Sequence, residues 1–418
     1  MKTHLLGFPR IGARREIKKA CERYWSGKAS FPELAGEGKK QRRYNWRLQQ
    51  EAGIDLIPCN DFSFYDQVLD MSVTVGAVPA RYRSLEGLSE TDLYFAMARG
   101  CQQDGLDVTA MEMTKWFDTN YHYIVPEFTT RQQFSLHPGK ALGEFSEAAG
   151  MGISPKPVII GPVSYLLLGK EKEAGFHRLD LLDNLLPVYR ALLLSLKQAG
   201  AEWVQLDEPF LTCSPGQREK NAFRTAYAYL KSEVPQIKLL AATYFEGLHE
   251  STELACSLGL DALHIDLVRA PGQLDKVLDL LPSSMILSVG VVDGRNIWKN
   301  DLSRSLGLVS RALDQLKEDS RLWIAPSCSL LHVPFDLDLE PAGGPLPEEV
   351  KKWTAFARQK VQEVVSIARL ASPRTRAGHS RDLKANILCM EERRKSPLVR
   401  NQAVQRRLSL QEGMPARN

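Results

Sequence analysis

Short apolar, β-rich runs recur along the chain with helix-like segments between most of them, and this alternation restricts the fold more than any other feature. Eight runs share this character, and they lie at residues 5–8, 54–59, 158–160, 203–206, 239–244, 263–265, 285–292 and 322–325. Between two of them, residues 178–200 place a row of Leu and Tyr side chains on one broad helical face and end at a glycine. Strands that alternate with helices form parallel sheets, so the sequence predicts an α/β fold.

Eight parallel strands can close into a (βα)8 TIM-type barrel. An open doubly wound sheet would carry a glycine-rich dinucleotide-binding turn, and the sequence contains none. We therefore predict a barrel with a long insertion and a basic helical tail at its C-terminal end. The insertion is the interval 61–156, which is longer than a βα unit requires and contains a further candidate strand at residues 111–117.

The charge distribution changes after a helix-patterned segment at residues 347–371. Residues 372–418 carry eleven Lys and Arg and four Asp and Glu, an excess of +7, while the whole chain carries +4, so the remainder carries −3. That remainder has no excess positive charge that would favour nucleic acid. We predict a barrel domain at residues 1–371 and an Arg-rich helix and linker at residues 372–418.

Cysteine usage and hydropathy indicate the compartment. The seven cysteines are widely separated, odd in number and without a Cys-x-x-Cys pair, which favours reduced thiols in a cytosol. Pro9 and Arg10 interrupt the first apolar run, and the sequence lacks an apolar segment of about 18 residues, the length that a membrane helix needs. We expect a cytoplasmic protein that does not bind membranes.

A basic segment near the N-terminus is a candidate anion site. A strand-like run breaks at Pro9 and Gly12, and a basic helix follows in which Arg15, Lys18 and Lys19 share one surface because of their three- and four-residue spacing. Free backbone N–H groups and the helix dipole favour negative charge at a helix start. The segment therefore suits an extended polycarboxylate or a phosphate. The alternative is a solvated basic face.

Polar side chains follow several predicted strands, where barrel enzymes place reactive groups. They are Asp207, Glu208, Asp266, Asp293 and Cys328. Adjacent residues on an extended chain point in opposite directions, so Asp207 and Glu208 need not form an acid–base pair. Two alternatives remain open: a functional cluster, or a buried hydrogen-bonded network that fixes the barrel mouth.

Several motifs recur in a fixed order along the chain. The motif Leu-Gly-Phe-Pro-Arg-Ile-Gly at residues 6–12 is followed by the tetrad Arg15, Glu16, Ile17 and Lys18. Further motifs lie at residues 53–58, 111–117, 120–123, 156–162, 203–209, 243–247, 263–266, 288–298 and 327–332. The set resembles the amino-terminal half of the cobalamin-independent methionine synthase family, whose tetrad reads Arg-Glu-Leu-Lys. Ile17 is a conservative departure from it.

The resemblance implies a methyltransferase that moves a methyl group from methyltetrahydropteroyl-triglutamate to homocysteine. In the family, the amino-terminal barrel contacts the glutamate tail of the folate. The matched positions here are Arg15, Glu16, Ile17 and Lys18, with Lys115 as a further cation. Arg and Lys suit the tail because each can give a carboxylate a charge-assisted hydrogen bond. Glu16 would act through its backbone or through a salt bridge to a neighbouring cation. No catalytic residue is assigned to this chain.

The resemblance places the catalytic zinc in a carboxy-terminal barrel, where His-x-Cys, a Glu and a later Cys hold the metal. The corresponding residues 241–245 here are Ala-Ala-Thr-Tyr-Phe. Asp266 and Cys328 stand near the carboxylate and second thiolate positions, and Arg295 stands near the catalytic His. Two donors do not complete a zinc site, which needs three or four. We therefore expect no metal or other cofactor in this chain.

Three hypotheses follow. The first is the folate-tail-binding half of a methionine synthase, inactive alone because the homocysteine thiolate needs the zinc of the second barrel. The second is a non-catalytic partner that docks, through its Arg-rich tail, onto a separately encoded zinc-containing barrel. In either case the partner is a carboxy-terminal catalytic barrel, in cis or in trans. The third is an independent barrel hydrolase or lyase that uses Asp207, Glu208 and Asp266.

Overall fold

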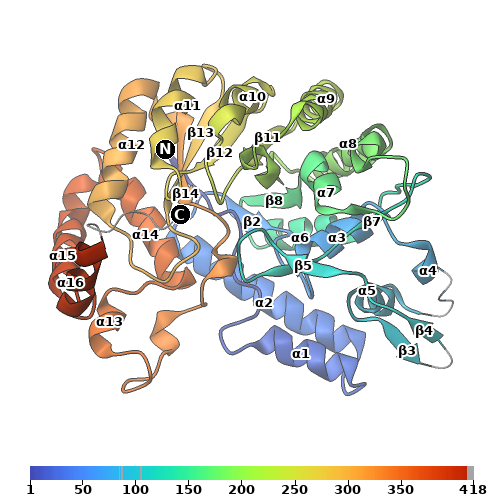
Figure 1. Ribbon diagram of the computed structural model, residues 1–418, viewed down its shortest axis with the longest axis horizontal. Helices are drawn as coiled ribbons and strands as arrows, with labels where there is room; N and C mark the ends of the chain where they lie inside the picture. The colour runs from blue at the N-terminus through green and yellow to red at the C-terminus, as the bar shows by residue number, and fades with distance from the viewer. Residues whose placement is uncertain (84, 86–87, 104–105, 412–418) are drawn as a thin grey trace.

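The computed structural model describes residues 1–83, 85, 88–103 and 106–411, and its centre is an eight-stranded parallel sheet curled into a barrel (Figure 1). In spatial order its strands are β1 (Lys2–Thr3), β14 (Leu322–Pro326), β13 (Ile286–Val292), β12 (Ala262–Asp266), β11 (Lys238–Ala242), β10 (Trp203–Asp207), β8 (Pro155–Ile160) and β2 (Ile57–Cys59). A parallel bridge between His4 and Leu56 joins β1 to β2 and closes the ring. The predicted (βα)8 barrel is confirmed.

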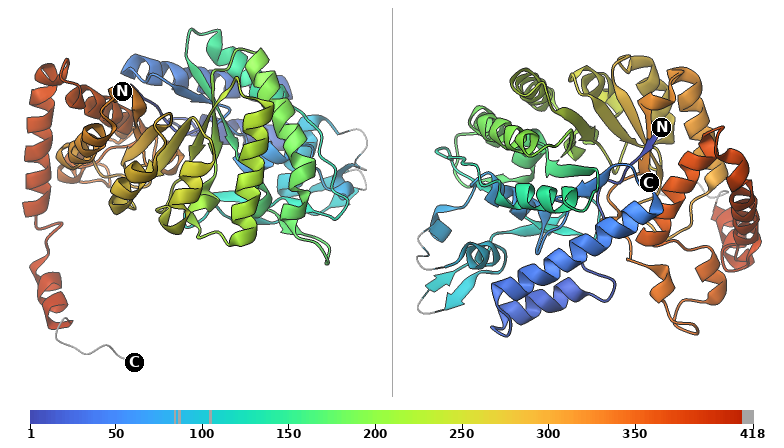
Figure 2. Two further views of the ribbon diagram at one scale, coloured as in Figure 1. Left: turned by 90° about the horizontal axis from the view of Figure 1, so that it is seen from above. Right: turned by 180° about the vertical axis from the view of Figure 1, so that it is seen from behind.

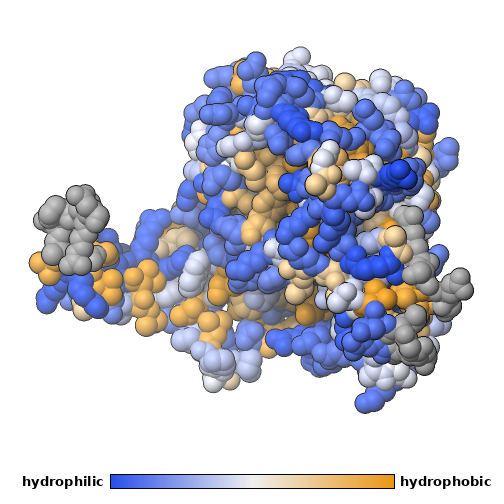
Figure 3. All heavy atoms as spheres, turned by 45° about the vertical axis from the view of Figure 1, so that its right-hand side comes forward, coloured by the Kyte–Doolittle hydropathy of each residue, from blue (hydrophilic) through white to orange (hydrophobic). Residues whose placement is uncertain are grey.

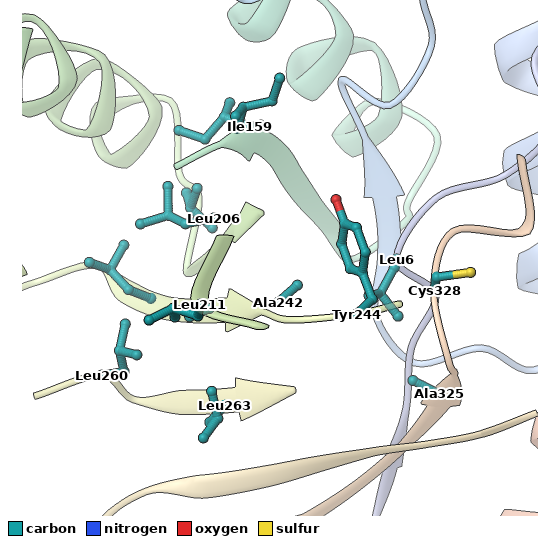
Figure 4. Close-up of a cluster of buried hydrophobic side chains, with 14 of the residues drawn as sticks. Leu6, Ile159, Leu206, Leu211, Ala242, Tyr244, Leu260, Leu263, Ala325 and Cys328 are labelled. Carbon is teal, nitrogen blue, oxygen red and sulfur yellow. The ribbon is translucent and has the colours of Figure 1, made fainter. Parts of the chain in front are cut away.

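Helices surround the strands (Figure 1). They are α2 (Phe31–Ala52), α6 (Gly139–Ala149), α7 (Pro162–Leu168), α8 (Leu182–Gln198), α9 (Gln217–Glu233), α10 (Thr252–Ser257), α11 (Leu274–Leu280), α12 (Leu302–Leu316) and α14 (Ala357–Ala371). The helix predicted at residues 178–200 forms as a short 3-10 turn followed by α8, and its predicted apolar face is buried. Figure 4 shows Leu206, Leu211 and Leu263 in the buried layer near the strands. Burial of such side chains stabilises the barrel by about 1.5–3 kcal/mol each.

The prediction of a strand at residues 5–8 is wrong, because β1 ends before this run. The apolar side chains of the run are buried, but side chains satisfy much of its backbone in place of neighbouring strands. These hydrogen bonds are Lys156 Nζ to Leu5 O (3.2 Å), Gln205 Nε2 to Leu6 O (3.1 Å) and Phe8 N to Asp61 Oδ2 (2.9 Å). An apolar segment can therefore be buried as deeply as a strand without pairing as one.

The predicted insertion lies between β2 and β8 and forms its own small elements. They are α3 (Gln67–Thr74), α4 (Ala80–Arg83), α5 (Glu90–Arg99), β3 (Cys101–Gln103), β4 (Leu106–Val108), β5 (Met113–Lys115), β6 (His122–Ile124) and β7 (Glu127–Phe128), followed by α6. The candidate strand at residues 111–117 is confirmed as β5. It pairs with β6 as an antiparallel hairpin outside the barrel sheet, whereas β7 pairs with β9 (Lys170–Glu171).

The basic tail is helical, as predicted, and follows α13 (Glu348–Lys352) and α14. Its first helix, α15 (Arg376–Lys395), packs against α12 and α14. The amide of Asn386 is buried there, accepts from Leu302 N (3.0 Å) and donates to Asn300 O (2.9 Å). The second helix, α16 (Gln402–Gln411), extends away from the barrel (Figure 2). The domain boundary at residue 371 stays a prediction. No helix in the described ranges is long and apolar enough to cross a membrane.

Candidate functional site

The predicted tail-binding tetrad lies at the start of α1 (Glu16–Trp25), which packs against α2. Arg15 precedes the helix and adopts a φ of 60°, a left-handed conformation that is uncommon for residues other than glycine. The side chains of Arg15 and Lys18 are exposed, whereas Ile17 is buried among apolar side chains of α2 and α5. Ile17 therefore anchors the helix, and the two cations face solvent. Lys18 forms a loose surface pair with Glu22 at 3.7 Å.

Glu16 folds back over the turn that precedes the helix. Its Oε2 accepts a hydrogen bond from Arg14 N (2.9 Å), and a Cβ on Gly12 would stand 2.1 Å from the same oxygen. Gly12 also has a φ of +87°, so both the conformation and the close approach require glycine. Within the described residues, Glu16 forms no ion pair with a neighbouring cation. Its carboxylate instead supports the backbone from which Arg15 projects.

Lys115 ends β5 and is exposed. It precedes the turn that joins β5 to β6, residues 116–121, which we call the hairpin turn. In the described part of the chain Lys115 forms no ion pair. Arg10 connects the hairpin turn to the loop before α1, because its guanidinium lies 5.1 Å from the centre of the Tyr121 ring and donates to Tyr65 O. Arg10 therefore links the loop that precedes α1 to the turn that follows Lys115.

Arg10 is a partly buried residue that the sequence analysis did not single out. Desolvation alone would lower the pKa of its guanidinium, but Tyr121, Tyr94, Asp66 and Asp70 raise it. A desolvated cation is costly unless such groups surround it. The only sign in the sequence that Arg10 matters is its place inside the motif at residues 6–12. Its partners, Tyr65 and Tyr121, lie far along the chain, so no local pattern reveals these contacts.

The two acidic residues at the end of β10, Asp207 within the strand and Glu208 after it, point to opposite sides of the strand. Asp207 accepts from Gln205 Nε2 (2.6 Å) and from Tyr244 OH (3.1 Å). Burial raises the pKa of Asp207 to about 6. Gln205 in turn accepts from the fully buried Lys156. This carboxylate therefore belongs to a polar chain that also binds the backbone after β1.

Glu208 points outward, toward α7 and α9. It accepts from Ser164 N (2.9 Å) and from Tyr227 OH (3.0 Å), and it is fully buried. Burial raises the pKa of Glu208 to about 7. A carboxyl group enclosed in this way links two helices to the end of β10 and has no opening to a substrate.

Asp266 and Cys328 are also enclosed. The partners of Asp266 are the backbone N–H groups of Phe245 (3.2 Å), Val268 (2.9 Å) and Arg269 (2.9 Å). Burial raises the pKa of Asp266 to about 6. Burial also raises the pKa of the Cys328 thiol, which disfavours the nucleophilic thiolate. Figure 4 shows Cys328 beside Leu6 and Tyr244 at the ends of the strands.

The strand-end groups therefore match the buried-network alternative and not a functional cluster. Donors already occupy the carboxylates that a hydrolase or lyase would need. Residues 241–245 include no His, Cys, Asp or Glu. Asp266 and Cys328 do not fit a zinc site either, because backbone N–H groups already bind the Asp266 carboxylate and burial disfavours the thiolate form of Cys328. Within the described ranges, no three His, Cys, Asp or Glu side chains gather so that they could hold a metal ion.

A cavity of about 740 Å³ lies beside β7, in the insertion. Its lining includes Arg81, Arg131 and Lys172, which the sequence analysis did not consider. Glu127 accepts from Arg81 Nη2 (2.8 Å) and lies 3.7 Å from Lys172 Nζ, so it compensates part of this positive charge. The cavity is separate from the exposed cations of α1.

Comparisons with known proteins give a consistent result. Residues 2–317 match the family described as "Cobalamin-independent synthase, N-terminal domain". A 5-methyltetrahydropteroyltriglutamate–homocysteine methyltransferase from Flavobacterium johnsoniae is 54% identical over 410 residues, which are 97% of this chain and 53% of the relative. The protein of the same name from Cytophaga hutchinsonii is 53% identical over 414 residues, 98% of this chain and 53% of the relative. The chain spans about half the length of the curated relatives it matches.

Two solved structures have a similar fold. The putative vitamin-B12 independent methionine synthase from Listeria monocytogenes aligns with a TM-score of 0.59 at 15% identity, over 88% of this chain and 98% of that chain. The B12-independent methionine synthase from Shewanella sp. W3-18-1, in complex with selenomethionine, aligns with a TM-score of 0.52 at 15% identity, over 84% and 92% of the two chains. At this identity the likeness shows the barrel fold alone.

Proposed function

Because the chain belongs to the cobalamin-independent methionine synthase family, we propose that it is the half of a 5-methyltetrahydropteroyltriglutamate–homocysteine methyltransferase that binds the glutamate tail of the folate. The match to the family's N-terminal domain supports this proposal, as does the coverage of about half of each long relative. The seven cysteines are free thiols, in keeping with a cytoplasmic enzyme.

The tail site consists of Arg15, Glu16, Ile17, Lys18 and Lys115. The observation that carries this assignment is the availability of its cations: Arg15 and Lys115 are exposed without an ion pair in the described part of the chain, and Lys18 has a loose one. An exposed ion pair of that kind contributes little to stability, so Lys18 can readily exchange Glu22 for a ligand carboxylate. Ile17 positions the cations by packing in the core, and Glu16 positions them through its hydrogen bond to Arg14 N in the preceding turn.

Methyl transfer itself requires a second barrel. The reaction needs homocysteine as a thiolate, and bound zinc lowers the pKa of such a thiol. The residues of this barrel do not fit a zinc site, as described above, so the zinc belongs to a partner barrel, in cis or in trans. We expect this chain alone to bind the folate tail without catalysing transfer.

Calorimetric titration tests the proposal directly. The chain is titrated with methyltetrahydrofolate that carries one or three glutamates, at low and at high salt. We expect the triglutamate form to bind more tightly, and this binding to weaken with salt because exposed charges are screened. Equal affinity for the two forms would refute a tail site. The absence of heat with both would refute the proposal that this chain carries the site by itself.

A second candidate is a non-catalytic partner that docks onto a separately encoded, zinc-containing catalytic barrel. Apolar side chains exposed on α15, on α16 and on the segment between them favour it, and they are Leu388, Leu398, Val399, Val404, Leu408 and Leu410 (Figure 3). Exposed apolar groups gathered on one arm mark interaction surfaces.

Gel filtration with the carboxy-terminal half of the Flavobacterium johnsoniae relative tests the docking hypothesis. We expect a one-to-one complex that Leu408→Glu weakens, while Lys384→Glu on α15 leaves it intact. Separate elution of the two halves at micromolar concentration would contradict docking through the tail.

A further inference from the structure

We propose that Asp118 is a positioning residue for the tail site: it holds the hairpin turn over the mouth of the barrel and thereby fixes Lys115, the residue that precedes the turn. This inference rests on the proposed function, because it concerns the same site. It adds to that function a mechanical connection between the barrel mouth and the tail-binding lysine.

The hairpin turn contacts loops that follow six of the barrel strands, namely β1, β10, β11, β12, β13 and β14. The contacts are Phe117 with Phe210 (5.4 Å between ring centres) and Phe245 (5.7 Å), Asp118 with Arg269 (3.3 Å) and Arg295 (2.7 Å), and Tyr121 with Arg10 (5.1 Å) and His332 (6.2 Å). Barrel enzymes admit substrate at this end of the strands. Here a segment of the insertion covers it.

The backbone of the hairpin turn depends on these contacts. Phe117 has a φ of 51°, which is unfavourable for a bulky side chain. Such conformations persist where the surroundings fix them. Inside the turn, Trp116 N donates to Tyr121 O (2.7 Å) and Thr119 Oγ1 donates to Trp116 O (2.6 Å). These bonds lie within the turn, so the contacts with the mouth are what fix the position of the turn, and of Lys115 before it, relative to the barrel.

Asp118 is the polar anchor of the hairpin turn. Arg295 donates to Asp118 twice, from Nη1 to the carboxylate (2.7 Å) and from Nη2 to the backbone oxygen (3.1 Å). The Arg295 side chain is 15% exposed and its guanidinium lies 5.0 Å from the centre of the Phe245 ring, so packing holds it. A second arginine, Arg269, approaches the other carboxylate oxygen.

Two acids at the strand ends, the buried Asp266 and the partly buried Asp293, hold the backbone of both arginines in place. Asp266 accepts from Arg269 N (2.9 Å), and Asp293 accepts from Arg295 N (2.8 Å). These carboxylates thus act through the arginines on Asp118, and through Asp118 on the lysine of the proposed site. This arrangement gives the strand-end acids a positioning task in place of a catalytic one.

Asp118→Asn in the full chain tests the inference by two readouts. Hydrogen exchange should accelerate at the amides of the hairpin turn, and affinity for methyltetrahydropteroyl-triglutamate should fall about three- to tenfold. In the Asp118→Asn background, Lys115→Ala should cost less affinity than it does in the unmodified chain, because the lysine is already displaced. Asp118→Glu, which keeps the charge, should restore most of both properties.

Asp275→Asn is the matched control. Asp275 pairs with Arg311 on the outer helices, and its side chain is as exposed as that of Asp118, 63% in each case. It should change neither readout. Unchanged hydrogen-exchange rates in Asp118→Asn would overturn the inference, whatever the affinity for the triglutamate. Faster exchange would also overturn it if the affinity were undiminished and the effect of Lys115→Ala on affinity were the same in both backgrounds. If the unmodified chain did not bind the triglutamate at all, the proposed function would fail and the positioning role with it, while the exchange data would still report on the turn.

Discussion

The carboxylate of Glu208 stands where a side chain on Gly161 would have to be: a Cβ built there would lie 2.1 Å from Glu208 Oε1. Gly161 precedes α7, and Glu208 reaches past it to Ser164 N and Tyr227 OH. The absence of a side chain at Gly161 is therefore a condition for burying this acid.

Gly161→Ala should accordingly destabilise the barrel. The added methyl group overlaps the Glu208 carboxyl and displaces it from two donors, which should cost about 2–4 kcal/mol of unfolding free energy. Urea unfolding followed by tryptophan fluorescence measures the loss. Gly143→Ala in α6 is the control, since a Cβ there meets no atom within 4 Å, and it should be neutral or stabilising by up to about 1 kcal/mol. Equal destabilisation by the two changes would contradict the steric argument.

Acid should destabilise the protein through a buried histidine pair. His264 Nδ1 lies 2.8 Å from Ser288 Oγ, which lies 2.6 Å from His4 Nε2. Burial lowers the pKa of His264 to about 3 and also lowers that of His4. The unfolded chain, with ordinary histidine pKa values near 6.5, therefore binds more protons than the native state between about pH 3 and 6.5.

Stability should thus decrease as the pH falls below about 6.5, by up to about 1.4 kcal/mol per pH unit for each histidine. Unfolding free energies from pH 7 to 4.5 for the native chain and for His264→Gln isolate this contribution, because the difference between the two curves cancels the other groups. The variant should lose less stability over this range. His137→Gln, at an exposed position, is the control and should keep the full dependence of the unfolding free energy on pH. Parallel curves of unfolding free energy against pH for all three proteins would show that His264 does not contribute.

The tetrad should act selectively on a polyglutamate. Arg15→Ala and Lys18→Ala should each weaken binding of the triglutamate folate about three- to tenfold, through loss of a charge-assisted hydrogen bond. Lys19→Ala, on the same helix but outside the tetrad, should have a smaller effect. Calorimetry at two salt concentrations measures all three. An equal loss with Lys19→Ala would indicate a general basic surface and no defined site.

Asn386 should determine whether α15 stays on the barrel. Asn386→Ala removes the bonds to Leu302 N and Asn300 O in a buried position, at a cost of about 1–3 kcal/mol. Limited proteolysis should then cleave α15 faster, as local opening becomes easier. Lys384→Ala, an exposed change on the same helix, provides the baseline. Indistinguishable cleavage rates would mean that α15 is held by its apolar contacts alone.

The sequence was informative where neighbouring residues decide the structure. Barrel strands β8 and β10 to β14 are buried, mostly apolar runs, and the predicted ranges agree closely with their bounds. The run at residues 5–8 looked the same but binds side chains of Lys156 and Gln205, which no local pattern reveals. The hairpin turn was equally hidden, since Asp118 and Arg295 are 177 residues apart. The tetrad was found through family resemblance, because a basic helix start alone does not distinguish a site from a solvated face.

The ring of strands closes between the first and the last of them, with Lys2 opposite Trp323. A ribosome delivers β1 long before β14, so the nascent chain carries an incomplete sheet with two open edges until β14 emerges. Closure is a late, non-local event, and pairings of this kind form slowly and expose strand edges to aggregation in the meantime. The period between the emergence of residue 56 and that of residue 326 is therefore when this chain most needs the protection of a chaperone.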